Sequence, residues 1–278
     1  MRSDARPVER IRLLFIHHSC GGQLLAEPGP DRELDPCIYL SHPNGGGLRR
    51  RLESGGFEVH EASYGSGIGE NTDLFDWLPK FRDQLDRILA VDSNDRLYPD
   101  GRRNQVVVWK SCFPNNLFRG VGHPPGDPRG PELTLWNAKA SFSALLPHLA
   151  RHPEVRFIYV TAPPVAQESR GDPRWKSLVK RLLGRPRASQ SGAWAREFNG
   201  WISSPSGWRA GYSGQNVLVL DYYDILTGGG RSNFLCYPTQ GGTDSHPSSE
   251  GNRLAADRFV ELLEGIIPRP AHAVPEAP

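Results

Sequence analysis

The chain has 278 residues, of which 23% are charged, and its formal net charge is only +2. This length is enough for one large α/β domain with a sizeable core. Because the net charge is small and no long Lys/Arg run is present, the sequence carries no electrostatic footprint for nucleic acid, and no nucleic acid partner is expected.

The sequence also lacks the segments that insert a protein into a membrane or export it. No apolar stretch approaches the length of a membrane span, and residues 1–7 lack the apolar core of a signal peptide. We therefore expect a cytoplasmic protein with no membrane partner.

Apolar segments alternate with amphipathic ones along the chain. In order, the patterns predict a strand at 11–18, a helix at 46–53, a strand at 57–63, a helix at 72–91, a strand at 105–110, a helix at 133–151, a strand at 155–161, a helix at 193–202, a strand at 216–221 and a helix at 248–267. Either Asn71 or Thr72 is a candidate N-cap for the second helix.

Five near-continuous apolar strands, separated by helices, are typical of a parallel sheet that is covered on both faces. The expected fold is therefore α/β, a three-layer αβα sandwich around a flavodoxin-like, doubly wound parallel sheet of five strands. In such sheets ligands bind at the carboxyl ends of the strands, near the point where the strand order reverses.

We expect a single domain over residues 1–267 and a disordered, Pro/Ala-rich tail at 268–278. Three long segments rich in Gly, Pro and Arg follow strand ends, at 20–47, 112–132 and 162–190. Because the carboxyl ends of parallel strands share one edge of the sheet, these segments should lie on the same rim. Loops of this length in a compact domain are commonly functional, so they predict a partly covered pocket there.

The four cysteines are Cys20, Cys37, Cys112 and Cys236, and no two of them form a CxxC pair. Such wide spacing indicates neither a disulfide scaffold nor a structural zinc site. We therefore expect reduced thiols and no cofactor or metal.

Two short segments at opposite ends of the chain carry candidate chemistry. Near the C-terminus, Asp244 and His246 lie in a predicted tight turn before a helix, and near the N-terminus an apolar strand runs into a Ser-Cys-Gly-Gly turn at Ser19. A serine hydroxyl needs an adjacent base to become nucleophilic, and the imidazole needs a carboxylate to orient it. In this α/β pattern the three residues predict a serine esterase, with Ser19 as nucleophile, His246 as general base and then acid, and Asp244 as the orienting group.

From residue 11 to residue 267 the chain resembles the SGNH (GDSL-like) hydrolases. Its nearest likeness is to a subgroup with His-His-Ser in place of Gly-Asp-Ser. The resembling blocks, in chain order, are FIHHSCG (15–21), YGSGIGENT (64–72), KSCFPNN (110–116), YVTAPP (159–164), REFNGW (196–201) and TDSHP (243–247).

The resemblance implies hydrolysis of a small-molecule or carbohydrate O-acyl ester through an acyl-enzyme, without a cofactor. It also implies an oxyanion hole formed by the backbone N–H of Ser19, the backbone N–H of Gly69 and the side-chain amide of Asn115. Asn116 is an alternative for the third donor, because the asparagine block lacks the usual Gly-x-Asn spacing.

Two departures from the family pattern concern the same site. His18 stands where the family usually has an aspartate beside the serine, and the usual Asp-x-x-His is shortened here to Asp244-x-His246. His17 and His18 are successive residues on a predicted strand and should point to opposite faces, so at most one of them is expected to join the site.

Other interpretations of the same residues stay open. Ser19 could simply end a strand, and Asp244 could cap the helix that follows. The chain could be a non-catalytic binding protein, an acyltransferase, or a metalloenzyme in which His17 or His18 joins Asp244 and His246 as ligands. The acyl length, the natural acceptor and the oligomeric state are not readable from the sequence.

Overall fold

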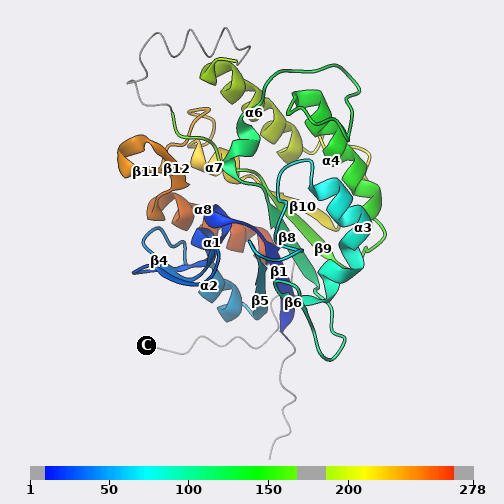
Figure 1. Ribbon diagram of the computed structural model, residues 1–278, viewed down its shortest axis with the longest axis vertical. Coiled ribbons are helices and arrows are strands. Elements are labelled where there is room, and N and C mark those ends of the chain that lie inside the picture. The colour runs from blue at the N-terminus through cyan, green and yellow to red at the C-terminus, as the bar shows by residue number, and fades with distance from the viewer. Residues whose placement is uncertain (1–9, 168–185, 266–278) are drawn as a thin grey trace, which may run out of the picture.

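The sheet at the centre of the protein is built from the five apolar strands that the sequence predicts (Figure 1). In the computed structural model, which describes residues 10–167 and 186–265, all neighbouring strands of this sheet run parallel. The strands are β1 (Ile11–Ile16), β5 (Phe57–Ala62), β8 (Val106–Lys110), β9 (Arg156–Val160) and β10 (Val217–Leu220). Their order is β10-β9-β8-β1-β5, which is the flavodoxin-like arrangement, and the predicted α/β fold is confirmed.

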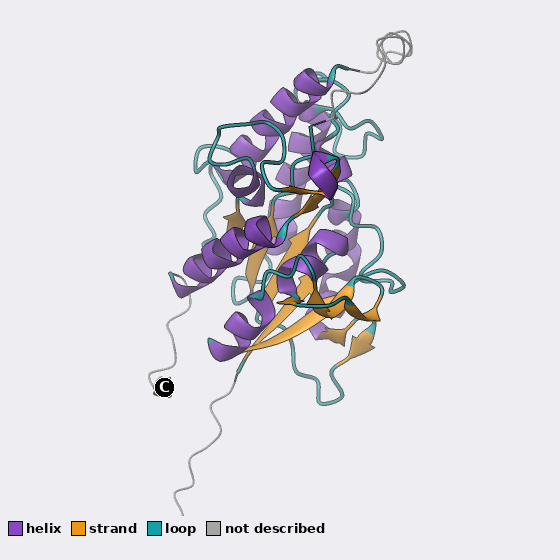
Figure 2. Ribbon diagram, turned by 90° about the vertical axis from the view of Figure 1, so that its left-hand side faces the viewer, coloured by secondary structure: helices purple, strands orange, loops and turns teal. Residues whose placement is uncertain are grey.

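Helices cover both faces of this sheet (Figures 1 and 2). They are α1 (Ser19–Leu25), α2 (Leu48–Ser54), α3 (Trp77–Ala90), α4 (Leu135–Leu149), α6 (Ala188–Ser203), α7 (Tyr222–Leu226) and α8 (Ser249–Glu264). Buried side chains of α3, α4 and α6 share one core cluster, and those of α1, α2, α7 and α8 contribute to a second.

Residues in the described part of the chain also form three small sheets outside the central one. Their strands are β2 (Glu27–Pro28), β4 (Ile38–His42) and β3 (Arg32–Asp35) in the first, β6 (Val91–Ser93) and β7 (Arg96–Leu97) in the second, and β11 (Pro238–Thr239) and β12 (Asp244–Pro247) in the third. The described residues also contain two single-turn 3₁₀ helices, η1 (Phe113–Asn116) and η2 (Gln240–Gly242). The predicted long segment 20–47 is therefore a helix followed by a small sheet.

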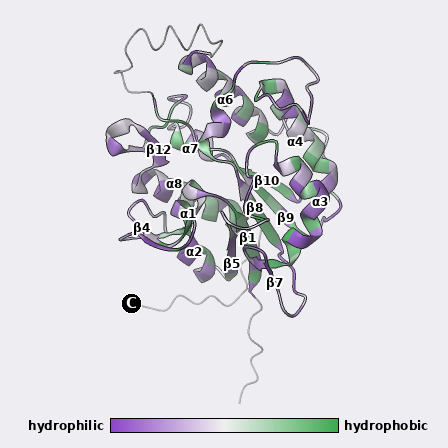
Figure 3. Cartoon of the chain, in the orientation of Figure 1, coloured by the Kyte–Doolittle hydropathy of each residue, from purple (hydrophilic) through white to green (hydrophobic). Residues whose placement is uncertain are grey.

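Strand alternation divides the core between the two faces of the sheet. Leu13 and Phe15 of β1 belong to the cluster with α1, α2 and α8, whereas Leu14 and Ile16 belong to the cluster with α3 and α4. Figure 3 shows the hydrophobic residues gathered on the central strands and on the helix sides that face them.

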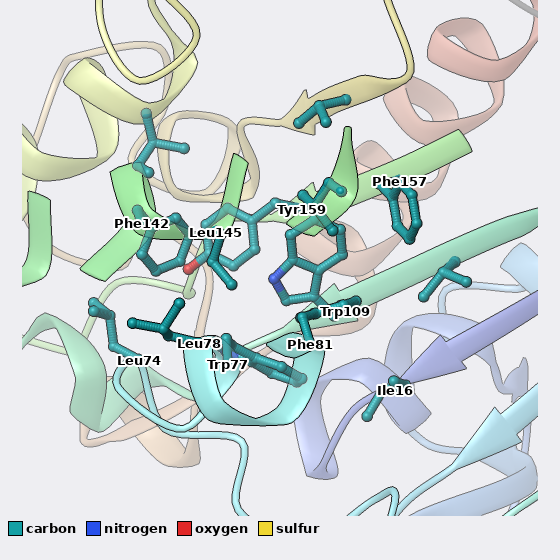
Figure 4. Packing of buried hydrophobic residues seen from close by; sticks show 14 of the residues in the cluster. Ile16, Leu74, Trp77, Leu78, Phe81, Trp109, Phe142, Leu145, Phe157 and Tyr159 are labelled. Atoms are coloured by element: carbon teal, nitrogen blue, oxygen red, sulfur yellow. The ribbon is translucent and has the colours of Figure 1, made fainter. Parts of the chain in front are cut away.

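Aromatic rings fill much of the space between the sheet and α3 and α4 (Figure 4). The rings of Phe81 and Trp109 lie 4.9 Å apart, and those of Phe142 and Tyr159 lie 4.8 Å apart, each pair edge-to-face. Edge-to-face geometry is a preferred arrangement for aromatic pairs because it brings the positive ring edge to the negative face.

The structure differs from the sequence prediction at three places near the sheet edge. The predicted Ser-Gly turn is the helix α1, and the predicted tight turn at Asp244 is the strand β12. The predicted helix at 72–91 begins only at Trp77, because Asn71 has a left-handed backbone (φ 53°) and the hydroxyl of Thr72 is hydrogen-bonded to His18 instead of capping the helix.

Among residues 10–167 and 186–265, no helix is long and apolar enough to cross a membrane. The predicted tail 268–278 and the part of the predicted 162–190 loop that spans 168–185 lie outside the described residues.

Truncation of Phe142, one of the aromatic rings between the sheet and α4, should lower the stability of the fold strongly. Phe142 is fully buried and contacts the rings of Tyr159, Phe198 and Trp208. We expect Phe142→Ala to lower the free energy of unfolding by about 3–5 kcal/mol, as cavity-forming phenylalanine truncations do. Denaturant titration would measure it, with the half-exposed Leu97→Ala as a control that changes by about 0.5 kcal/mol or less. Equal losses in the two variants would contradict this account of the core.

Candidate active site

Ser19, His246 and Asp244 lie together at the carboxyl edge of the sheet. Ser19 begins α1, three residues after the end of β1, while Asp244 and His246 are both on β12. The Nε2 atom of His246 is 3.1 Å from the Oγ atom of Ser19, and its Nδ1 atom is 2.8 Å from the Oδ1 atom of Asp244. The three side chains thus form one hydrogen-bonded series from elements 227 residues apart in the chain.

The spacing Asp-x-His works here because the segment is a strand. Side chains two residues apart on a strand point to the same side, so Asp244 and His246 face each other without a longer turn. The carboxylate of Asp244 also accepts a hydrogen bond from the hydroxyl of Thr239 on the paired strand, at 2.9 Å. The hairpin therefore fixes the carboxylate from two sides.

Asp244 is held in its ionised form. Partial burial alone would raise the pKa of Asp244, but the hydrogen bonds from His246 and Thr239 outweigh it and lower the pKa below its ordinary value. An ionised carboxylate only accepts, so Nδ1 of His246 carries the proton that it donates. Nε2 is then free to accept the proton of the Ser19 hydroxyl, which is the tautomer a general base requires.

Two glycines of α1 let this helix pack closely against neighbouring segments. A Cβ atom on Gly21 would overlap the Cβ atom of His17, and one on Gly22 would overlap the carbonyl oxygen of Cys37. Helix α1 therefore lies directly against the end of β1 on one side and against the segment leading into β4 on the other. Tertiary packing of this kind overrides the poor helix propensity of the Cys-Gly-Gly sequence.

His18 connects the serine segment to the glycine block. Its Nε2 atom lies 2.8 Å from the carbonyl oxygen of Gly69, and its Nδ1 atom lies 3.0 Å from the hydroxyl of Thr72. Burial is the largest cause that lowers the pKa of His18 to about 4, so the ring is neutral at pH 7. A neutral ring suits these partners, because Nε2–H donates to the carbonyl and Nδ1 accepts from the hydroxyl.

His17 points to the other side of the sheet, where it meets a buried carboxylate. Its Nε2 atom lies 2.6 Å from Glu61 of β5, which also pairs with Arg49 of α2, and its Nδ1 atom lies 3.1 Å from the carbonyl oxygen of His18. As predicted, the two histidines diverge. Neither of them contacts Asp244 or His246 in any hydrogen bond of the described residues.

The predicted oxyanion donors other than Ser19 have acceptors of their own. The N–H of Gly69 donates to the hydroxyl of Ser66 at 2.8 Å. The side-chain amide of Asn115 donates to Asp73 at 2.9 Å and to the carbonyl of Cys112 at 3.2 Å, while its oxygen accepts from the N–H of Leu74 at 2.6 Å. Asn115 thereby joins η1 to the segment before α3.

Asn116, the alternative for the third donor, is turned into the fold. Its amide donates to the carbonyl oxygens of Ala162 and Pro163, both at 2.9 Å, and its oxygen accepts from Asn199 of α6 at 2.8 Å. All these groups are buried, so Asn116 ties η1 to the end of β9 and to α6.

Aromatic and imidazole rings that the sequence did not single out border the site. Tyr64 stacks on His18 with ring centroids 3.4 Å apart and is 38% exposed. Phe113 of η1 meets the ring of His246 edge-on at 5.4 Å. Burial lowers the pKa of His42 on β4, and the nearby ring of His246 lowers it further. The sequence signals for these residues were weak: Tyr64 and Phe113 lie in the resembling blocks 64–72 and 110–116, and His42 lies in the long segment 20–47.

A cysteine beside Ser19 does not compete with it as a nucleophile. Burial raises the pKa of the Cys20 thiol to about 12, so that thiol stays protonated, and all four cysteines are free.

The interpretation of the site as a metal centre lacks a set of ligands among the described residues. In the described part of the chain, no three or more His, Cys, Asp or Glu side chains are placed to hold a metal ion.

The contacts of Asn115 predict a structural effect when its amide is removed. We expect Asn115→Ala to lower the free energy of unfolding by about 1–3 kcal/mol, since the buried N–H of Leu74 and the carboxylate of Asp73 lose a partner. Thermal or denaturant unfolding would measure this. Unchanged stability would contradict this account of its contacts. A loss of esterase activity of about a hundredfold or more in the folded variant would mark Asn115 as an oxyanion donor as well.

The neutral state of His18 predicts a pH dependence of stability. The folded pKa of about 4 lies below the unfolded value of 6.5, so the unfolded chain binds an extra proton between these values. The stability is then complete above pH 6.5 and declines as the pH falls toward 4. We expect the Tm of the wild type to fall more over this range than that of His18→Asn, whose side chain does not titrate. If Tm falls equally with pH in wild type and in His18→Asn, the assignment of a neutral His18 is contradicted.

Comparison with known proteins shows only remote likeness. No family model matches the sequence, and no curated protein matches it. A candidate acylhydrolase from Bacteroides fragilis is 16% identical, with 91% of this chain and 86% of that chain covered and a TM-score of 0.47. A family two carbohydrate esterase from Clostridium thermocellum, solved with cellohexaose, is 12% identical, with 92% and 64% covered and a TM-score of 0.40. Likenesses this remote assign no activity to the chain.

Proposed function

We propose that the protein is a serine ester hydrolase of the SGNH type, working through an acyl-enzyme on Ser19. The observation that carries the proposal is the continuous hydrogen-bonded series from Asp244 through His246 to the hydroxyl of Ser19. A helix cap or a simple strand end would not require three such side chains to meet from opposite ends of the chain. Ser19 is half-buried, so an ester can reach its hydroxyl.

Acylation follows from the protonation states of the three groups. The Oγ atom of Ser19 attacks the ester carbonyl while its proton passes to Nε2 of His246. The imidazolium that forms is stabilised by the ionised Asp244, and it then protonates the leaving alcohol oxygen as the tetrahedral intermediate collapses. The products of this half-reaction are the free alcohol and an acyl ester on Ser19.

Deacylation repeats the same steps with water. His246 removes a proton from the attacking water, and the second tetrahedral intermediate collapses to release the carboxylic acid and restore the Ser19 hydroxyl. Water is the acceptor that we propose. The proposed substrates are O-acyl esters of a carbohydrate or a small metabolite.

The oxyanion formed in both steps needs donors that are in place before the reaction. We propose the backbone N–H of Ser19 as the first of them. Gly69 remains the proposed second donor, shared with the hydroxyl of Ser66, and Asn115 the proposed third, which would have to release Asp73. Loss of one such donor typically lowers the rate about a hundred- to a thousandfold.

Hydrolysis of p-nitrophenyl acetate, butyrate and octanoate would test this proposal. We expect Ser19→Ala and His246→Ala to lower kcat by about a millionfold each, because residues that act as a unit fail together. Asp244→Asn should lower kcat by about ten-thousandfold through the wrong imidazole tautomer. The exposed Ser143→Ala and His123→Ala serve as matched controls with wild-type rates.

A fluorophosphonate probe provides an independent readout. Wild type and both controls should be labelled at Ser19, and Ser19→Ala should not be labelled. Folded wild-type protein that hydrolyses none of the three esters and resists the probe would overturn the proposal and favour a non-catalytic binding protein.

A further inference from the structure

The carbonyl oxygen of His18, immediately before Ser19, receives three hydrogen-bond donors. The N–H groups of Gly21 and Gly22 lie 2.8 Å and 3.2 Å from it, and Nδ1 of His17 lies 3.1 Å from it. The first two are ordinary bonds of a helix start. The third comes from a buried side chain one residue after the end of β1.

This carbonyl determines where the N–H of Ser19 points. The two groups belong to one planar trans peptide, so they point in opposite directions. Three donors on the carbonyl oxygen of His18 fix the plane of the peptide that joins His18 to Ser19. The N–H of Ser19 is therefore turned away from the interior of α1. Among the described residues this N–H meets no hydrogen-bond acceptor, as expected for the first residue of a helix. It is therefore available to a substrate oxygen.

The ring of His17 has a partner at each nitrogen. A backbone carbonyl only accepts, so Nδ1 of His17 donates to the carbonyl of His18 at 3.1 Å. Nε2 lies 2.6 Å from the buried carboxylate of Glu61, which also pairs with Arg49 of α2. Burial alone would raise the pKa of Glu61, but the hydrogen bonds and charges of His17 and Arg49 lower it. Glu61 and Arg49 therefore hold the ring in the orientation that brings Nδ1 to the carbonyl of His18.

We propose that His17, held by Glu61 and Arg49, is a positioning residue for the reaction: through the carbonyl of His18 it aims the N–H of Ser19 at the oxyanion. This inference rests on the proposed esterase activity and adds a residue that touches neither the substrate nor the Asp244–His246 pair. Its effect belongs to the transition state, where the oxyanion forms, and so it should appear in kcat with little change in KM.

Two substitutions separate the two ring nitrogens of His17. The amide nitrogen of asparagine occupies nearly the position of Nδ1, so His17→Asn keeps a donor for the carbonyl of His18 and loses the one for Glu61. The amide nitrogen of glutamine reaches nearly the position of Nε2, so His17→Gln keeps the bond to Glu61 and loses the other. We expect kcat for p-nitrophenyl acetate to be at least about tenfold lower in His17→Gln than in His17→Asn, since misplacement by about 1 Å can cost a hundredfold.

A purely structural role predicts the reverse order. Glu61 is buried and loses a partner only in His17→Asn, so stability alone would favour His17→Gln. Unfolding curves and KM are therefore measured beside kcat. If both variants are folded and His17→Gln is as active as His17→Asn, or more so, the inference fails while the esterase proposal stands. If wild type is inactive and Ser19 is not labelled by the phosphonate, both fail.

Nuclear magnetic resonance on the wild type decides the matter if the variants do not fold. In protein carrying ¹⁵N-histidine, Nδ1 of His17 should carry a proton, whereas His18 should show one on Nε2 alone at pH 7. A ring proton of His17 on Nε2 with none on Nδ1 would overturn the inference, because the carbonyl of His18 would then lack its side-chain donor.

Discussion

The close approach of chain segments at the end of β1 is the constraint on which the rest of the site depends. Helix α1 starts so near the sheet that Gly21 abuts His17, and it lies so near the incoming β4 segment that Gly22 abuts Cys37. No side chain larger than hydrogen fits at either glycine without moving backbone or a buried ring. Because of this closeness, Ser19 has one orientation and the neighbouring histidines have fixed partners.

The two histidines before Ser19 have different partners on opposite sides of the chain. His18 is neutral and fastens the glycine block to the serine segment, while His17 lies on the other face of the sheet with the ionised Glu61. A single aspartate at position 18, as in the more usual pattern of the family that the sequence resembles, could accept hydrogen bonds but could not donate one to the carbonyl of Gly69. His18 therefore supports the site through hydrogen bonds that an aspartate at position 18 could not make.

Much of the fold was readable from the sequence, because each central strand is a near-continuous apolar run. The strand β12 was not readable, since Asp-Ser-His-Pro has no apolar alternation and owes its extended form to pairing with β11. Helix α1 contains two adjacent glycines and forms through packing. The meeting of Ser19 with His246 followed from the order of motifs, but the partners of Gly69 and Asn115 depend on tertiary contacts that no spacing reveals.

The separation of the site along the chain has a consequence during synthesis. During synthesis Ser19 leaves the ribosome before its hydrogen-bonding partner His246, which follows 227 residues later. A growing chain that has already formed β1, β5 and β8 therefore carries the serine without a base. On the proposed mechanism, the protein becomes active only when the β11–β12 hairpin and α8 have packed against the sheet. A truncated product that lacks them is therefore inactive, however well its remaining core folds.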